Sequence, residues 1–585
     1  MTGSSDPSAS AAARQEAASQ PRRDRATGQG RAGWLQRLRP TRANASTWLP
    51  ALLAVLLIVA AFATMVARAV EMGFHNRQPV WVVDAIPPVL SEQYYGHQKR
   101  YTALAEVQRR FFARVNREVA TAESINAAMR RLAETGTNSA GESYVLLGPD
   151  DKGIVDLVGA SFRLFGLRTS SILTLYFAIL LASSALYVVA FWRSASALLL
   201  LAAFLVMFTL VMPMLMYNPQ LRSLLALRVL PILSMVACLH ALMFVATSLH
   251  RRIGVLSVIL LALQIALISF TIHLRSTTLW QVATIMGFGV AALVVPQVVA
   301  RIRRVNVPLL PGRSTLLGAG VATGLMIAGY VGLQVYQATA LPEEYRRGDE
   351  IATRVFWHNV FTGFAYHPEL QGRFKIWLDD VSIMAATRDY LSEIGRADVW
   401  RDMGGTETGF EGVKFAKYDP IVRDMLVARC TVFVRECLET FLWYKPVSLV
   451  QNLAWLYGFR ELPPDLDVAD SPYFGDILKR QFLGTSDGLD RSGRRAYLWT
   501  PAALLVIVPF VALLLLEPRP LAWPTLSAGV ALALGATIPT VVGYAAPHTV
   551  AEAAIAFGMV IYLGGCLAVA GGVRAILRMA RTTPV

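Results

Sequence analysis

The chain has 585 residues, of which 55% are hydrophobic and only 16% are charged. Soluble domains carry about 25% charged residues, so this composition excludes a purely soluble array of domains and indicates a large membrane-embedded part. The net charge of +15 would suggest nucleic acid as the partner of a soluble protein. In a membrane protein, Arg and Lys are placed by topology, so their positions along the chain decide between the two interpretations.

Ten stretches of about 20 mostly apolar residues predict membrane-spanning helices. One lies at residues 48–70, six lie within residues 171–337 and three lie within residues 498–573. The first is preceded by residues 1–47, whose content of Ala, Ser, Gly, Gln and Arg is typical of a disordered tail. The predicted spans are Trp48–Val70, Ser171–Trp192, Ala195–Tyr217, Leu224–Leu249, Ile253–Ile272, Leu279–Ala300, Leu316–Gln337, Leu498–Leu516, Leu521–Tyr544 and Ala553–Val573.

Basic residues gather in alternate connections between these spans. Eight Arg residues precede the first span, and others follow the second, fourth, sixth, eighth and tenth spans, namely Arg193, Arg251, Arg252, Arg301, Arg303, Arg304, Arg313, Arg519, Arg574, Arg578 and Arg581. Cytoplasmic loops carry an excess of Arg and Lys, so both termini, including the tail at residues 574–585, are predicted to be cytoplasmic. We expect a multi-pass protein of a bacterial plasma membrane with no nucleic-acid partner.

Two long connections, residues 71–170 and residues 338–497, are then extracytoplasmic. Both contain apolar residues at helical spacing, for example in Tyr101–Glu134 and in Asp419–Phe441, and neither has a strand-rich stretch. The sequence therefore predicts an α-helical polytopic membrane protein with about ten spans. Its two large, mostly α outer segments follow the first and the seventh span.

Carboxylates are missing from most of the predicted membrane part. No Asp or Glu occurs from Leu157 to Pro342, and the last three spans add only Glu517 and Glu552, near their ends. Proton- or sodium-coupled transporters usually carry ionisable side chains within the bilayer, because the ion needs a partner there. The pattern disfavours coupled transport, and it assigns any acid–base chemistry by carboxylates to the outer segments.

Arg222, Arg228 and Arg275 lie at the outer rim, where the topology rule minimises positive charge. One interpretation is snorkelling, in which long side chains reach the interface from helix ends. The other is a cationic set for a lipid phosphate, because a guanidinium group pairs with phosphate oxygens through two hydrogen bonds. Lys152, Arg163 and Arg168, which lead into the second span, would join such a set.

Residues 149–193 read PDDKGIVDLVGASFRLFGLRTSSILTLYFAILLASSALYVVAFWR. A charged start, an interfacial amphipathic helix that ends in Leu-Phe-Gly, and a span that enters the cytoplasm at Arg193 resemble the corresponding region of GT-C membrane glycosyltransferases. Those enzymes use polyprenyl-phosphate sugars. Asp151-Lys152-Gly153 stands at the start of this region, without the double Pro of those families. The layout is similar over residues 48–380, and Trp357-His358 belongs to a string similar to one in bacterial GT-C-like proteins of unassigned substrate.

The resemblance implies a catalytic carboxylate in the first outer segment. This general base would take the proton of an acceptor hydroxyl as the lipid phosphate leaves. Asp84 is the best positional match, although a turn or capping role before its Pro pair is an equal alternative. Asp150, Asp151 and Asp156 are rivals for the same role. The substrate-binding residues would be Lys152, Arg222, Arg228, Arg275, Trp357 and His358.

The implied partners are a polyprenyl-phosphate sugar, membrane lipids and a saccharide or protein acceptor. A second hypothesis is a non-catalytic membrane protein for export of lipid-linked saccharides or for assembly of the cell envelope. It needs no catalytic carboxylate, so indifference to changes of single carboxylates would favour it.

No cofactor is expected. Asp379-Asp380 and the pair Asp465 and Asp467 have the oxygen ligands that a divalent cation needs. A loop signal is the favoured interpretation of both, because Asp is a common turn residue.

Two of the four cysteines, Cys430 and Cys437, lie in the second outer segment, where an oxidising compartment would permit a disulfide. A continuous helix is predicted through both, and it would separate them by about 10.5 Å at about 1.5 Å per residue. Disulfides bridge Cα atoms up to about 7 Å apart. The sequence therefore predicts two free thiols.

Overall fold

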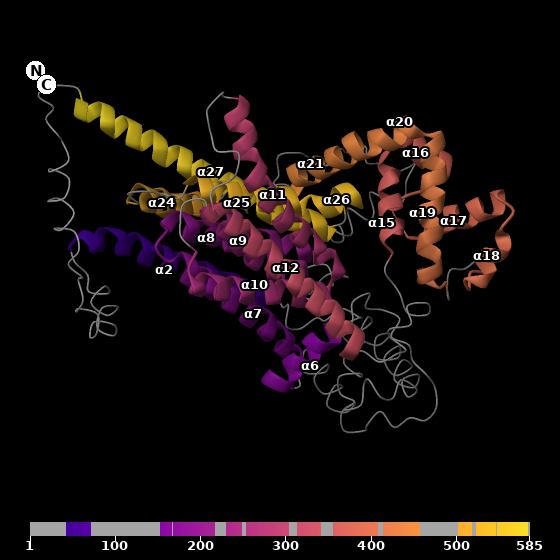
Figure 1. Cartoon of the computed structure of the whole chain (residues 1–585), viewed down its shortest axis with the longest axis horizontal. Helices are drawn as coiled ribbons and strands as arrows, with labels where there is room; N and C mark the ends of the chain where they lie inside the picture. The colour runs from indigo at the N-terminus through magenta and orange to yellow at the C-terminus, as the bar shows by residue number, and fades with distance from the viewer. Residues whose placement is uncertain are drawn as a thin grey trace, which may run out of the picture. The chain divides into compact units, whose positions relative to one another are not determined.

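The computed structural model describes residues 42–71, 153–216 except residue 167, 230–248, 253–302, 313–340, 355–378, 380–406, 413–456, 501–516, 522–545 and 547–582. Every regular element in these ranges is a helix (Figure 1). By their contacts, residues Pro50–Val585 form one unit. The helices fall into a membrane set and a polar set.

Eight helices in the described ranges are long and apolar enough to cross a membrane: Leu49–Val70, Ser170–Phe191, Leu230–Ser248, Val255–Leu274, Ser276–Val299, Leu316–Thr339, Ala522–Val542 and Thr549–Met579. They belong to α2 (Arg42–Glu71), α7 (Thr169–Phe191), η4 with α9 (Leu230–Ser234 and Met235–Ser248), α10 (Val255–Leu274), α11 (Leu279–Ile302), α12 (Arg313–Ala340), α25 with α26 (Ala522–Ala536 and Ile538–Val542) and α27 (Pro547–Thr582). The predicted helical, multi-pass membrane character is thus confirmed.

Two further apolar helices, α8 (Ala195–Met216) and α24 (Pro501–Leu516), lie where the remaining two spans are predicted. The count of ten spans stays a prediction. In the ninth predicted span the helix is interrupted at Thr537, just before Pro539. Proline lacks the N–H that an α-helix needs in its interior, and it clashes with the preceding turn.

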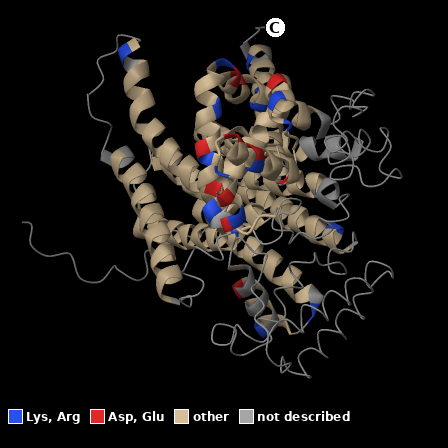
Figure 2. Ribbon diagram, turned by 90° about the vertical axis from the view of Figure 1, so that its right-hand side faces the viewer, with Lys and Arg blue, Asp and Glu red and all other residues tan. Residues whose placement is uncertain are grey.

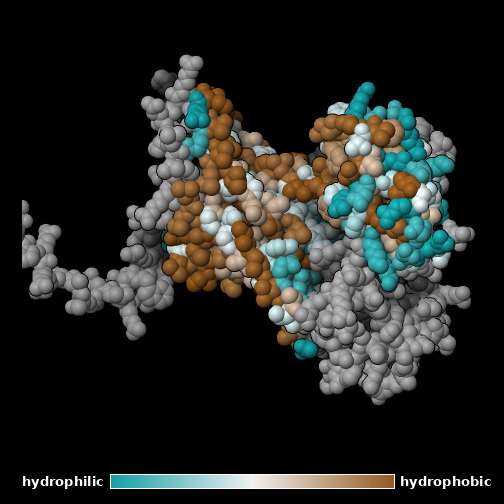
Figure 3. All heavy atoms as spheres, turned by 45° about the vertical axis from the view of Figure 1, so that its right-hand side comes forward, coloured by the Kyte–Doolittle hydropathy of each residue, from teal (hydrophilic) through white to brown (hydrophobic). Residues whose placement is uncertain are grey.

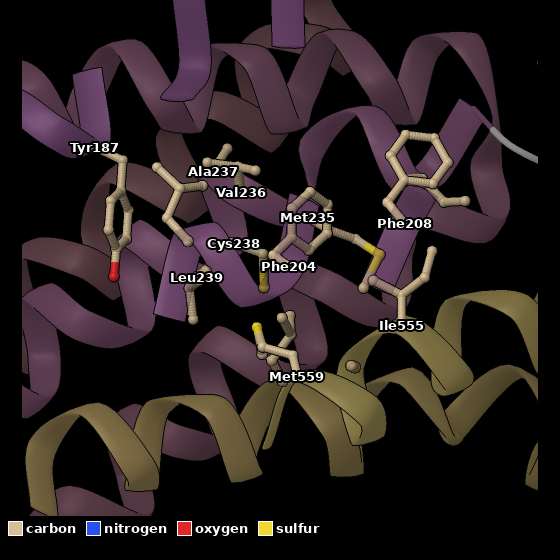
Figure 4. Close-up of a cluster of buried hydrophobic side chains, with 14 of the residues drawn as sticks. Tyr187, Phe204, Phe208, Met235, Val236, Ala237, Cys238, Leu239, Ile555 and Met559 are labelled. Atoms are coloured by element: carbon tan, nitrogen blue, oxygen red, sulfur yellow. The ribbon is translucent and has the colours of Figure 1, made fainter. Parts of the chain in front are cut away.

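Helix α9 lies at the centre of the apolar core. Its residues are buried on all sides, and it packs against α7, α10, α11, α12 and α25. A helix that is apolar around its whole circumference is stable only when other helices surround it. Side chains of α8, α9 and α27 meet in one cluster there, including Phe204, Cys238 and Met559 (Figure 4).

The described part of the predicted second outer segment consists of small helices, which we call the helical body (residues 355–444 except 379 and 407–412). They are α15 (Phe356–Thr362), η6 (Gly363–Tyr366), α16 (Pro368–Phe374), α17 (Asp380–Glu393), α18 (Ala397–Asp402), α19 (Phe415–Val432), α20 (Val434–Glu439) and the π-helical turn η7 (Thr440–Tyr444). The helical body has an apolar core of its own. Charged residues gather on its helices, whereas the spans are almost free of them (Figure 2). In the space-filling view, apolar residues cover the visible faces of the spans (Figure 3).

Cys430 and Cys437 form a disulfide, with their Cα atoms 5.7 Å apart. The prediction of two free thiols is therefore wrong. It assumed one continuous helix, but α19 ends just before Phe433, whose φ of −112° and ψ of 53° are not helical. The chain turns at this residue, and the turn shortens the distance between the two cysteines.

Helix α21 (Lys445–Leu456) continues from η7 and ties the helical body to the spans. Its first residue, Lys445, is fully buried. The Lys445 Nζ donates hydrogen bonds to the carbonyl oxygens of Val360 in α15, at 3.2 Å, and Val542 in α26, at 2.8 Å. The Tyr366 hydroxyl accepts a hydrogen bond from the backbone N–H of Ala545, at 3.0 Å.

Gly363 lies at the tightest point of this junction. A Cβ atom on Gly363 would overlap the carbonyl oxygen of Gly543 and the side chain of Lys445. Only glycine lets the two backbones approach this closely. The junction therefore joins α15, α21 and α26 through backbone groups as well as side chains.

Candidate functional site

Helix α6 (Gly153–Phe165) leads from the first outer segment to the spans, and it packs against α7 and α10. Asp156 lies in its first turn, where the helix dipole favours a negative charge. The start of α6 lies against the end of α10: a Cβ atom on Gly153 would come within 2.6 Å of the backbone and the ring of His273. Glycine at this position is what permits the approach.

Asp156, His273 and Gln337 form a hydrogen-bonded chain across three helices. The Oδ2 atom of Asp156 lies 2.8 Å from Nε2 of His273, and the Nε2 amide of Gln337 lies 3.0 Å from Nδ1 of the same ring. Because the Gln337 amide donates to Nδ1, the ring proton resides on Nε2 and is donated to Asp156. The ring of Tyr336 stands edge-on to the imidazole, at 5.6 Å between centroids.

Exposure differs along this chain of hydrogen bonds. The His273 side chain is 3% exposed, whereas the Asp156 side chain is 30% exposed. The carboxylate is therefore held from the buried side and is reachable from the outside. Such an arrangement fits a group that orients or deprotonates a bound hydroxyl.

A second polar contact lies at the same end of the bundle. Glu552 of α27 is buried, and its Oε2 accepts a hydrogen bond from Nε1 of Trp280 at 2.8 Å. Its Oε1 has no hydrogen-bond partner among the described residues. The guanidinium of Arg275, the residue that follows α10, attracts this carboxylate. The tenth span was predicted to begin at Ala553, but α27 begins at Pro547, and this places Glu552 inside the helix.

Two of the predicted site residues, Asp156 and Arg275, lie among the described residues of this region. Both lie where α6 meets the end of α10, the end that the charge pattern predicts to be outside, which we call the outer end. Asp84, Asp151, Lys152, Arg222 and Arg228 lie outside the described residues, so their roles stay predictions.

Trp357 and His358 lie in α15 of the helical body. Nδ1 of His358 lies 2.8 Å from the Tyr418 hydroxyl, and Nε2 lies 3.0 Å from Oδ1 of Asp380. The Asp419 carboxylate accepts hydrogen bonds from the backbone N–H groups of Trp357 and His358, which satisfies the start of the helix. Burial raises the pKa of the Tyr418 hydroxyl, so it stays protonated. The substrate-binding role of Trp357 and His358 stays a prediction.

The described residues contain no group of three or more His, Cys, Asp or Glu side chains that could hold a metal ion. Asp380 bonds to His358, as described above. Asp379, Asp465 and Asp467 lie outside the described residues, so the predicted cation alternatives are not tested there.

His273, Gln337 and Glu552 were not predicted as site residues. His273 and Gln337 are polar residues at the ends of two otherwise apolar helices, and both ends are predicted to be outside. Such polar side chains at matching ends of spans are a signal that sequence alone offers.

Comparison with protein-family models, curated proteins and solved structures finds no match to this chain. The resemblance to GT-C glycosyltransferases therefore rests on the quoted residues and on the layout of the spans.

Proposed function

We propose that the chain transfers a sugar from a polyprenyl-phosphate donor to an acceptor hydroxyl at the outer face of a bacterial plasma membrane, with Asp156 as the general base. The observation that carries the proposal is the pairing of Asp156 with His273 where α6, α10 and α12 meet. A partly exposed carboxylate at the end of the bundle that is predicted to be outside would be accessible to a membrane-borne substrate. The disulfide of the helical body supports the outer location, because disulfides persist in oxidising compartments.

In the proposed reaction, the acceptor oxygen attacks the anomeric carbon of the donor sugar. The bond between that carbon and the phosphate oxygen breaks, the phosphate leaves with the electron pair, and the hydroxyl proton passes to Asp156. His273 donates a hydrogen bond to the carboxylate, which orients it. Gln337 fixes the ring tautomer that makes this donation.

Arg275 is the proposed partner of the leaving phosphate. It lies two residues after His273, and a guanidinium group matches the geometry of phosphate oxygens. Lys152, Arg222 and Arg228 are proposed to complete the cationic set.

One observation favours the second hypothesis, a non-catalytic role in export of lipid-linked saccharides or in envelope assembly. The same hydrogen bonds hold α6 against α10 and α12, and a purely structural role of this kind would need no substrate. The test therefore has to distinguish a structural role of Asp156 from a role as general base.

The matched experiment compares Asp156→Asn with Asp380→Asn, because each variant alters an aspartate bonded to a buried histidine. Purified protein in liposomes receives radiolabelled polyprenyl-phosphate sugars and a cell-envelope acceptor fraction, and transfer is counted. We expect Asp156→Asn to lower transfer by at least about 100-fold, the scale of general-base catalysis, and Asp380→Asn to leave it unchanged.

Full transfer by a folded Asp156→Asn variant would remove Asp156 from the mechanism. The non-catalytic hypothesis is favoured by two results together. The wild-type protein transfers none of the donor sugars in liposomes, and a bacterial strain from which the protein is deleted has an envelope without one of its saccharides.

A further inference from the structure

Helices α20, η7 and α21 form one helical run, Val434–Leu456. Large apolar side chains stand exposed along it. Leu442 is 74% exposed, and Trp443 and Val450 are each 63% exposed. Val434 and Leu438 precede Leu442 at intervals of four residues, which places them on the same side of a helix. Proteins rarely leave such an apolar face in water.

The opposite side of this run belongs to the membrane core. Leu449 of α21 is buried in the same apolar cluster as the spans, and Leu453 packs against it. Helix α21 also contacts α26 and α27 directly. The hydrogen bond from Lys445 reaches Val542, the last residue of a membrane-spanning helix.

These contacts fix the depth of α21. A helix whose inner side packs on the outer end of two spans lies at the level where those spans leave the hydrocarbon. The surroundings of spans at this level are lipid, so the outward side of α21 faces the same lipid. The residue types agree, because Trp is enriched at the boundary between membrane and water, and Leu and Val suit the acyl region.

The π-helical turn η7 contributes to this face. It spans Thr440–Tyr444, and two consecutive residues within it, Leu442 and Trp443, are both directed outward. Arg435, at the far end of the run, pairs with Glu439 four residues later, at 2.7 Å. The exposed run therefore combines a broad apolar face with charged residues near its start, Arg435, Glu436 and Glu439, as expected for an amphipathic helix at a membrane surface.

We propose that Val434–Leu456 is an interfacial helix that lies in the plane of the membrane, with Leu442 and Val450 in the acyl region of the outer leaflet and Trp443 at its boundary with water. Its occupant is bilayer lipid, and the same run anchors the helical body to the membrane surface. The proposal does not depend on glycosyl transfer, because it rests on packing and exposure alone.

The test places single cysteines at Leu442, Val450 and Val381 of the full-length protein in phosphatidylcholine nanodiscs. Val381 is the matched control: it is 61% exposed and apolar, but it lies on α17, which packs against α15, α18 and α19 of the helical body. Each cysteine carries a fluorophore that responds to water, and half of the samples contain lipids with a nitroxide on the acyl chain. Protein without an introduced cysteine gives the labelling background, since Cys238 and Cys566 are buried.

We expect labels at positions 442 and 450 to emit at shorter wavelength than the label at position 381, and to lose at least half of their emission to the acyl nitroxide. The label at position 381 stays in water and is not quenched. Emission at 442 and 450 that matches position 381 would overturn the proposal. A shift to shorter wavelength without quenching would also overturn it, because the face would then be covered by protein.

Discussion

Two regions of the molecule each contain a buried histidine that is hydrogen-bonded to an aspartate. His273 pairs with Asp156 at the outer end of the spans, at 2.8 Å, and His358 pairs with Asp380 in the helical body, at 3.0 Å. Both imidazoles are almost fully buried, and both use Nε2 for the aspartate and Nδ1 for a third side chain. By these distances alone the two pairs are equivalent.

Their surroundings differ. The Asp380 side chain is 77% exposed on a body rich in acids, and His358 joins α15 to α17 and α19. Asp156 stands beside a membrane module whose sequence has no other acid up to Pro342. A contact between histidine and aspartate therefore does not define a functional role by itself. Its place relative to the membrane separates the proposed base from a pair that stabilises a fold.

Removal of His273 tests this difference between the two pairs most directly. We expect His273→Leu to lower kcat of the proposed transfer by about 100-fold with little change in KM. The carboxylate of Asp156 loses the hydrogen bond that orients it, whereas binding of the polyprenyl-phosphate sugar is retained. His273→Gln places an amide near the former Nε2, and it should recover most of the rate. The measurement is steady-state kinetics in liposomes for both variants.

A purely structural role for His273 predicts a different result. It would lower the yield of folded protein and leave the kcat of the folded fraction unchanged, and His273→Gln would show no rescue of kcat.

The matching change in the helical body is His358→Leu. Its buried ring bonds to Tyr418 and Asp380, so we expect a loss of about 2 kcal/mol in local stability from two broken hydrogen bonds. Hydrogen exchange of the amides of α15 and α17 measures it. The kcat of the folded protein should not change, whereas a rise in KM would report the predicted substrate-binding role of His358. An activity loss equal to that of His273→Leu would erase the distinction between the two pairs.

The spans could be predicted because long apolar runs have few other structures open to them. Asp156 could be named as a candidate from its place before the second span. His273 could not be linked to it, because 117 residues separate the two and no local pattern encodes the contact. A three-dimensional pairing of helix ends decides which polar residues meet.

The disulfide shows a second limit of the sequence. Helical spacing around Cys430 and Cys437 is correct on each side, but one residue, Phe433, leaves the helical region and turns the chain. Phe has an ordinary helix propensity, so packing rather than the propensity of Phe433 decides where the helix ends. The start of the tenth span was predicted at Ala553, just after Glu552, for a similar reason. Polarity suggested an end of the span at Glu552, but packing against neighbouring helices allows α27 to begin at Pro547.

We expect the smallest effect at Lys445, which joins the helical body to the spans and donates hydrogen bonds to two carbonyl oxygens. Burial lowers the pKa of Lys445 to about 7, from its ordinary value of about 10.5. Between these values the folded protein holds a neutral amine, whose two N–H groups still serve both carbonyls, whereas the unfolded chain binds a proton. Unfolding therefore takes up a proton, and stability rises with pH in this window by up to about 1.4 kcal/mol per pH unit.

Below pH 7 the lysine is protonated in both states, and this contribution to the pH dependence vanishes. Between pH 7.5 and 8.5 we expect the stability of the junction to rise by about 1 kcal/mol in the wild-type protein, measured by hydrogen exchange of the α21 amides. Lys445→Met should lose this rise, whereas the control Lys417→Met, at an exposed position of α19, should keep it. An equal rise in Lys445→Met would show that Lys445 stays charged at the junction, stabilised by the two carbonyls and by the rings of Phe364 and Phe441 that lie beside its Nζ.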